Sequence, residues 1–173
     1  QFYIEDESMP VRSMVKDYTS GDFNCAASPY YRWVSKMTMR EILQNLVQMN
    51  YLDADRQKRW EEDGFEMNIG ITSRTSTGRV EEIAIQIEDT LITLKNWQIR
   101  RLFSDNQKNP LPSTLFFLKS SPSQETLFYI IGAGYGHGRG MCQWGAIGQS
   151  LSGKSYQDIL LFYYPNLVLN KIY

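Results

Sequence analysis

The sequence predicts an α+β fold with a mixed, mainly antiparallel sheet and short helices. Apolar and polar residues alternate at 67–71 and again at 83–87, on either side of a turn signal, which is typical of a hairpin with one buried face. A capping box opens a helix near residue 38. Predicted strands and helices do not alternate regularly along the chain, which argues against a doubly wound parallel sheet.

The elements of the first part can be placed in chain order. Residues 1–30 look like loop, because proline, glycine and asparagine interrupt any periodic pattern. The aromatic run 30–34 reads as a strand. Thr38 and Glu41 have the spacing of a capping box, and apolar residues follow them at helical spacing. We expect the charged residues 50–64 to form a solvated connector.

The later elements follow from the same reasoning about periodicity, caps and turn residues. The hairpin turn is expected at 75–78, where threonine, serine and glycine gather. After the hairpin we expect a strand at 91–94, a short helix capped by Asn96, a loop at about 104–113, strands at 114–118 and 126–131, a helix at 141–151, and a last helix opened by Ser155 and Asp158 and ended by Pro165.

Charge and composition exclude several classes of protein. The chain of 173 residues has 18 basic and 19 acidic residues, so nothing in its charge favours a nucleic acid or an anionic membrane as partner. No apolar run approaches the roughly 20 residues of a membrane helix. Residues 1–7 do not resemble a signal peptide. A disulfide between Cys25 and Cys142 is possible in an oxidising compartment, but sequence cannot set their distance, and we expect two unbridged thiols.

The most informative stretch is 132–140, where glycine occupies every second position. In an extended chain this pattern leaves one face as bare backbone and places Tyr135, His137 and Arg139 together on the other. Bare backbone allows a ligand or another chain to approach closely. Since His137 is the chain's only histidine, the stretch is a candidate site. A strand in which only glycine fits against a neighbour is the alternative, and both can hold together.

Other glycine and histidine chemistries fit less well. No frame of 132–140 satisfies the G-x-G-x-x-G dinucleotide fingerprint. Residues 148–155 match the phosphate P-loop pattern, but no apolar strand leads into them and part of the stretch reads as helix. His137 and the two cysteines are too few for a closed zinc site without a carboxylate, and no serine-hydrolase elbow is present. We therefore expect neither a metal nor a cofactor.

Several segments together resemble one known family. The stretch Gly134-Tyr-Gly-His-Gly-Arg-Gly-Met-Cys-Gln-Trp-Gly-Ala146 looks like the signature of the SpoIID/LytB family, which includes stage II sporulation protein D-like peptidoglycan lytic transglycosylases and amidase enhancers. The glycine–histidine–methionine–glutamine part is specific. Supporting similarity runs in order over almost the whole chain, at 28–33, 75–80, 111–116, 153–160 and 163–165.

The resemblance implies that residues 1–173 are the C-terminal part of a SpoIID-like α+β domain. Members with lytic transglycosylase activity cleave glycan strands between N-acetylmuramic acid and N-acetylglucosamine, and the alternative is a non-catalytic, glycan-binding amidase enhancer. The family commonly has serine where this chain has Cys142. Its catalytic glutamate and its Cys/His metal-binding stretch have no match here, and Glu7-Ser-Met-Pro10 is only a superficial echo of the glutamate motif. The general acid is thus expected outside this chain.

The expected site residues bind substrate. Tyr135, His137 and Gln143 would hold sugar hydroxyls or N-acetyl groups. Arg139 would pair with a carboxylate of the substrate, and Trp144 would stack on a sugar ring or pack in the core. The implied partners are peptidoglycan glycan strands and either the remaining half of the domain or a cell-wall amidase. The implied location is the extracytoplasmic cell envelope.

Overall fold

A computed structural model describes residues 23–121 and 127–170 and confirms an α+β fold of antiparallel sheets and short helices. One sheet has the strand order β1-β6-β5 and the other the order β2-β3-β4. In chain order the elements are β1 Arg32–Thr38, α2 Met39–Gln48, α3 Ala54–Asp63, β2 Met67–Arg74, β3 Val80–Ile87, β4 Thr90–Lys95, α4 Trp97–Leu102, β5 Phe116–Ser121, β6 Leu127–Ala133, α5 Gln143–Leu151 and α6 Tyr156–Tyr163.

The expected hairpin forms the second sheet. Strands β2 and β3 pair antiparallel with Ile69 opposite Ile85, and the turn at 75–78 joins them. The register shifts between Ile71 and Arg74, which twists the end of β2 nearest the turn. In β3 the residues Ile83, Ile85 and Ile87 are buried and those between them are half-buried, so this part of the strand follows the alternation seen in the sequence.

One hydrophobic core is shared by the two sheets and by helices α2 and α4. At its centre the rings of Phe103 and Phe116 meet edge to face, with centroids 5.9 Å apart. Phe116 belongs to β5, while Phe103 follows α4, so this contact joins the first sheet to a helix. The largest fully buried side chains are Phe103, Phe116, Ile42, Leu43, Leu46, Ile83, Ile85, Ile87, Leu94, Ile99, Leu102 and Ile130.

Two capping boxes form as the sequence predicts. The Glu41 backbone N–H donates to the Thr38 hydroxyl at 3.2 Å, and the Glu41 carboxylate accepts the Thr38 N–H at 2.9 Å. The same reciprocal pair joins Ser155 and Asp158 at the start of α6. Each box satisfies backbone N–H groups that a helix start otherwise leaves unpaired. Both helices therefore begin directly after the residue that supplies the cap.

Two expectations about local structure are wrong. Within 50–64, expected to be a connector, residues Ala54–Asp63 form α3 instead. Asp53 caps this helix by accepting the Arg56 N–H at 2.7 Å, and none of its ten residues is fully buried, so no apolar stripe marks it in the sequence. Asn96 precedes α4 but makes no side-chain cap bond, since its backbone takes a φ of 49°.

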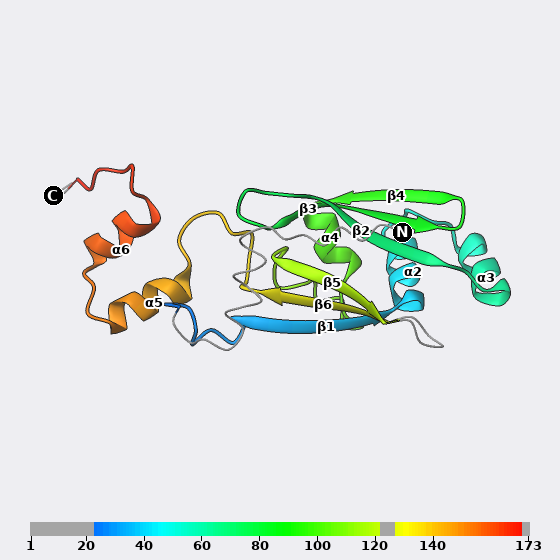
Figure 1. The fold of residues 1–173 in the computed structure, drawn as a ribbon, viewed down its shortest axis with the longest axis horizontal. Coiled ribbons are helices and arrows are strands. Elements are labelled where there is room, and N and C mark those ends of the chain that lie inside the picture. The colour runs from blue at the N-terminus through cyan, green and yellow to red at the C-terminus, as the bar shows by residue number, and fades with distance from the viewer. Residues whose placement is uncertain (1–22, 122–126, 171–173) are drawn as a thin grey trace.

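The two sheets and α2, α4 form the body of the molecule, and α5 and α6 lie together at one end of its long axis (Figure 1). Helix α3 lies at the opposite end (Figure 1). Strand β6 leads out of the first sheet toward α5, so the glycine-rich stretch connects the body to this pair of helices. Among the described residues, no helix has both the length and the apolar character needed to cross a membrane.

Candidate functional site

The glycine-rich stretch does not continue as an extended ribbon, so that expectation is wrong. After β6 ends, the backbone turns repeatedly. The next four glycines, at every second position, have positive φ values that other residues rarely adopt. We call residues 134–140 the glycine loop. The φ values are 72° at Gly134, 90° at Gly136, 71° at Gly138 and 92° at Gly140.

The start of the glycine loop is held by β1 and by the loop before β5. The Gly134 N–H donates to the Tyr30 carbonyl at 2.8 Å, and the Trp33 indole N–H donates back to the Gly134 carbonyl at 3.0 Å. The Gly136 N–H donates to the Pro112 carbonyl at 2.8 Å. The Trp33 ring also fills the space beside Gly132, where a Cβ would collide with it. Close approach is therefore the reason for glycine at 132.

Arg79 supports the middle of the glycine loop from the hairpin turn. Its Nη1 donates to the Gly136 carbonyl at 3.4 Å, and its guanidinium occupies the space beside Gly138. Burial lowers the pKa of the Arg79 guanidinium, and the charge of Arg100 lowers it further. Sequence reasoning missed Arg79 as part of the site. The available signal was only that it lies in the 75–80 segment, which resembles the same family.

His137 is exposed at the tip of the glycine loop. Its Nδ1 accepts the backbone N–H of Arg139 at 2.9 Å. In a neutral imidazole one nitrogen accepts and the other carries the hydrogen, so this bond assigns the hydrogen to Nε2. No described residue forms a hydrogen bond with Nε2, which leaves an oriented donor facing solvent.

Two residues before His137, Tyr135 forms an aromatic surface with Tyr30. The ring centroids are 4.7 Å apart, and Tyr135 remains 66% exposed. Apart from the chain neighbours, no heavy atom of the described residues lies within 4 Å of the position that a Cβ would take on Gly134 or Gly136. The Cα faces of the two glycines that flank Tyr135 are therefore open, which allows a ligand to approach closely. Tyr30 is a second residue that sequence reasoning did not place in the site.

Gln143 and Trp144 begin α5, directly after its N-cap residue Cys142. Both side chains are exposed, and Trp144 at 38% exposure is not a member of the buried core. The Met141 N–H donates to the Tyr164 hydroxyl at 3.1 Å, which ties the end of the glycine loop to the end of α6. All five expected site residues thus lie on the loop or the helix that follows, although no hydrogen bond among described residues joins two of their side chains.

The described residues supply neither a metal cluster nor a carboxylate at the glycine loop. No group of three histidine, cysteine, aspartate or glutamate side chains comes together in residues 23–121 and 127–170. No hydrogen bond or ion pair within those ranges joins a carboxylate to residues 134–140. The echo Glu7-Ser-Met-Pro10 lies outside the described residues.

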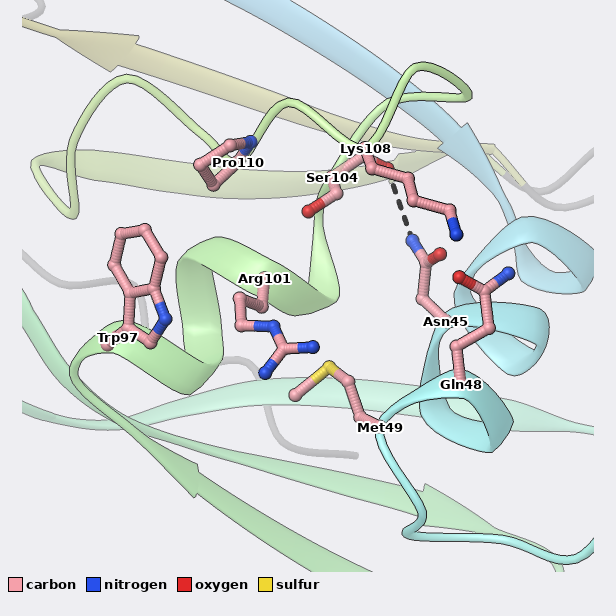
Figure 2. A pocket seen from close by; sticks show the side chains of 8 residues that line it. All are labelled: Asn45, Gln48, Met49, Trp97, Arg101, Ser104, Lys108 and Pro110. Carbon is pink, nitrogen blue, oxygen red and sulfur yellow. Dashed lines mark hydrogen bonds between the residues drawn. The ribbon is translucent and has the colours of Figure 1, made fainter.

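A cavity of about 350 Å³ lies away from the glycine loop, between α2, α4 and the loop that follows α4 (Figure 2). The Asn45 amide NH₂ donates to the carbonyls of Leu102 and Ser104 at 2.8 and 3.1 Å, so it is committed to holding that loop. The cavity contains none of the expected site residues. It is lined by Asn45, Gln48, Met49, Trp97, Arg101, Ser104, Lys108 and Pro110.

The fold and the site define a class: an α+β domain that presents an exposed imidazole and an aromatic pair on a glycine loop. The chain belongs to the family described as a domain of unknown function, DUF8618, whose model matches residues 4–140. That match contains both sheets and the glycine loop, while α5 and α6 follow it.

Two proteins are similar over parts of the chain. An uncharacterized protein of Brachyspira hyodysenteriae is 35% identical over 97 residues, which are 56% of this chain and 24% of that protein. The amidase enhancer of Bacillus subtilis is 47% identical over 57 residues, which are 33% of this chain and 8% of that protein. The chain therefore spans a quarter or less of these relatives. The second match shows that one segment of this chain is similar to a segment of an amidase enhancer.

Proposed function

We propose that the glycine loop binds peptidoglycan glycan strands and that this chain is the C-terminal part of a SpoIID/LytB-like domain that remodels the cell wall. One observation carries the proposal: His137 presents an oriented, solvent-facing Nε2–H on a loop in which the Cα faces of Gly134 and Gly136 are open. The similarity to an amidase enhancer supports peptidoglycan as the glycan and the cell envelope as the location.

The exposed groups match the chemistry of an amino-sugar chain. The Tyr135–Tyr30 pair offers an apolar ring surface to the C–H face of a pyranose. The His137 Nε2–H donates to a sugar hydroxyl or an N-acetyl carbonyl. Gln143 adds donor and acceptor atoms of its own, and Trp144 adds a second ring. Arg139 pairs with a lactyl or peptide carboxylate through its guanidinium fork.

Cleavage of the glycan needs a group that the site lacks. Breaking a β-1,4 glycosidic bond requires a carboxylic acid to protonate the leaving oxygen. In a lytic transglycosylase a base then takes the proton of the sugar's own 6-hydroxyl, and an anhydro ring closes in place of attack by water. In this proposal a part of the protein outside this chain supplies the carboxyl group, and the glycine loop positions the sugar against it.

An amidase enhancer is the second candidate, and the observation behind it is the 47% identity over 57 residues to the Bacillus protein. Here the same loop would present glycan to a cell-wall amidase without cutting it. A muropeptide digest separates the two functions. Anhydro-muramic ends identify a lytic transglycosylase, whereas loss of stem peptides only when an amidase is added identifies an enhancer.

Binding to purified sacculi tests the proposal with two changes at one residue. In His137→Asn the amide oxygen takes the place of Nδ1 and accepts the Arg139 N–H, but the Nε2–H is lost. We expect a loss of affinity of about threefold to tenfold, the value of one hydrogen bond. His137→Ala also removes the acceptor that orders the loop and should bind more weakly still.

The control for this test is Gln48→Ala, which alters the cavity between α2 and α4 and leaves the glycine loop untouched. It should bind sacculi as the unchanged chain does. Equal binding by the unchanged chain and by both folded His137 variants would exclude the imidazole from glycan recognition.

A further inference from the structure

A turn ahead of β1 packs against α5, at the far end of the chain. The Asn24 carbonyl occupies the space beside Gly148 of α5, where any Cβ would collide with it. The turn is held by its own backbone bonds, from the Ala26 N–H to the Phe23 carbonyl at 2.9 Å and from the Ser28 N–H to the Cys25 carbonyl at 3.0 Å. Cys25 is thereby fixed next to the helix.

Cys142 lies at the N-terminus of the same helix. Its Sγ accepts the Gly145 N–H at 3.3 Å and caps α5, and the residue is exposed. The turn that carries Cys25 and the cap residue Cys142 thus meet at the same helix, and after burial it is Cys142 that raises the pKa of the Cys25 thiol. These are the chain's two cysteines, so the fold brings together a pair that the sequence holds far apart, and both thiols are free in the structure.

Their surroundings distinguish the two sulfur atoms. Cys25 is half-buried, and burial raises the pKa of its thiol, with a further rise from the nearby Cys142. Tyr163 of α6 packs against the first turn of α5, where its hydroxyl fills the space beside Gly145. Burial raises the pKa of the Tyr163 phenol. Because Cys142 is exposed and Cys25 is half-buried, Cys142 is the thiol that a soluble disulfide can reach first.

We propose that Cys25 and Cys142 form an intramolecular disulfide that locks the turn ahead of β1 to the start of α5. The oxidant is a low-molecular-weight disulfide such as glutathione disulfide. The Cys142 thiolate attacks one glutathione sulfur, which breaks the glutathione S–S bond and releases one glutathione thiolate. The Cys25 thiolate then attacks the Cys142 sulfur and releases the second. The protein loses two electrons and two protons, and glutathione disulfide becomes two glutathione thiols.

The bond would act directly beside the candidate site. Gln143 and Trp144 follow Cys142 in the chain, and the glycine loop precedes it. A covalent link at residue 142 therefore restrains both the end of the loop and the first turn of α5. The inference concerns the two thiols alone and stands whether or not the loop binds glycan.

The test equilibrates the full chain in buffers of reduced and oxidised glutathione, alkylates the remaining thiols with N-ethylmaleimide under denaturing conditions, and measures the intact mass. Cys25→Ser and Cys142→Ser are the matched variants, since each removes one sulfur with little change in size. Serine at 142 also keeps an N-cap oxygen for α5, so this variant should fold.

The expected product of the unchanged chain is a monomer that is two hydrogens lighter and takes no maleimide, while each variant carries one maleimide or one glutathione. Its Tm should rise by several degrees on oxidation, as expected when a bond restrains a long loop of the unfolded chain, and the Tm of the variants should not. The proposal is overturned if the unchanged chain yields only glutathione adducts, linked dimers or doubly alkylated monomer.

Discussion

At the scale of single residues, the alternating glycines of 132–140 serve two different physical needs. At Gly132 and Gly138 a side chain of another strand or turn fills the space where a Cβ would stand. At Gly134 and Gly136 that space is empty, and the positive φ requires glycine instead. Glycine is therefore required by tight packing at some positions of the stretch and by a positive φ at others.

Gly136→Ala tests the second need. An alanine held at a φ of 90° should lower the free energy of unfolding by about 1–2 kcal/mol, since left-handed backbone is costly for a residue with a Cβ. Urea unfolding measures this loss, and binding to sacculi should weaken as the loop changes shape.

The matched control is Gly64→Ala, remote from the loop in the sequence, with a φ of 83° and equally open surroundings. It should lose similar stability and keep full sacculus binding. If Gly64→Ala weakens sacculus binding as much as Gly136→Ala does, the weaker binding reports general destabilisation and not the glycine loop.

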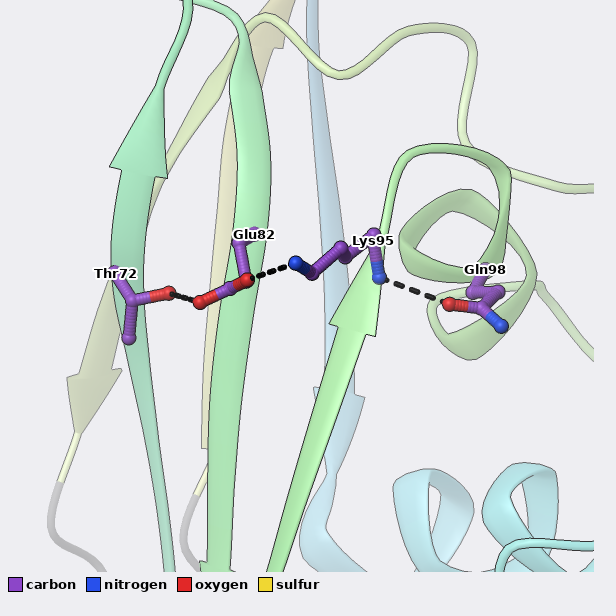
Figure 3. A network of polar contacts seen from close by, with 4 residues as sticks. All are labelled: Thr72, Glu82, Lys95 and Gln98. Atoms are coloured by element: carbon purple, nitrogen blue, oxygen red, sulfur yellow. Dashed lines mark hydrogen bonds and ion pairs between the residues drawn. The ribbon is translucent and has the colours of Figure 1, made fainter.

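At the scale of elements, a polar network crosses the outer face of the second sheet. Glu82 of β3 accepts the Thr72 hydroxyl at 2.8 Å and pairs with Lys95 of β4 at 2.8 Å (Figure 3). The Lys95 N–H in turn donates to Gln98 of α4 at 3.0 Å (Figure 3). The network thus joins three strands to the start of α4, where Gln98, and not Asn96, receives a backbone donor.

This network predicts a pH-dependent contribution to stability. The hydrogen bonds from Lys95 and then Thr72 lower the pKa of the Glu82 carboxyl below its ordinary value. A depressed carboxyl pKa stabilises the fold above the ordinary value, and the stabilisation disappears as the pH falls through the folded-state pKa. Glu82→Gln should therefore lower the urea midpoint at neutral pH, and the deficit should close as the pH falls through the lowered pKa of Glu82.

Glu62→Gln is the comparison for this series. Glu62 pairs with Lys58 at 3.9 Å on the exposed surface of α3, with no second partner among the residues that the structure describes. Exposed pairs of this kind contribute little, so its urea midpoint should follow that of the unchanged chain at every pH. A deficit of Glu82→Gln that stays constant with pH would assign the effect to packing and not to the charge.

What the sequence could predict depends on how local the cause is. The capping boxes at Thr38 and Ser155 use partners three residues away, and both form as expected. Helix α3 was not predicted, because a cap and charged pairs stabilise it and no apolar stripe marks it in the sequence. The turning path of the glycine loop and the role of Arg79 depend on partners from distant segments, which no spacing rule contains.

At the scale of the whole molecule, the described core belongs to the body and not to α5 and α6. The buried hydrophobic cluster is drawn from residues 37–130. The paired helices contribute Ile159 to the buried apolar residues, while Leu151 of α5 is 82% exposed. The glycine loop and the turn around Cys25 are therefore the main ties between the helices and the body.

This arrangement predicts two levels of local stability. In the reduced chain, amides of α5 and α6 should exchange with solvent through openings that cost less free energy than those of α2 and β3, because few buried apolar contacts resist them. Native-state hydrogen exchange measures both sets in one experiment. Oxidation of Cys25 and Cys142 should slow exchange at the first turn of α5 and leave α2 unchanged, as a covalent tie removes openings that separate this turn from the body. Equal opening free energies for α5 and β3 in the reduced chain would show that the helices and the sheets unfold as one cooperative unit.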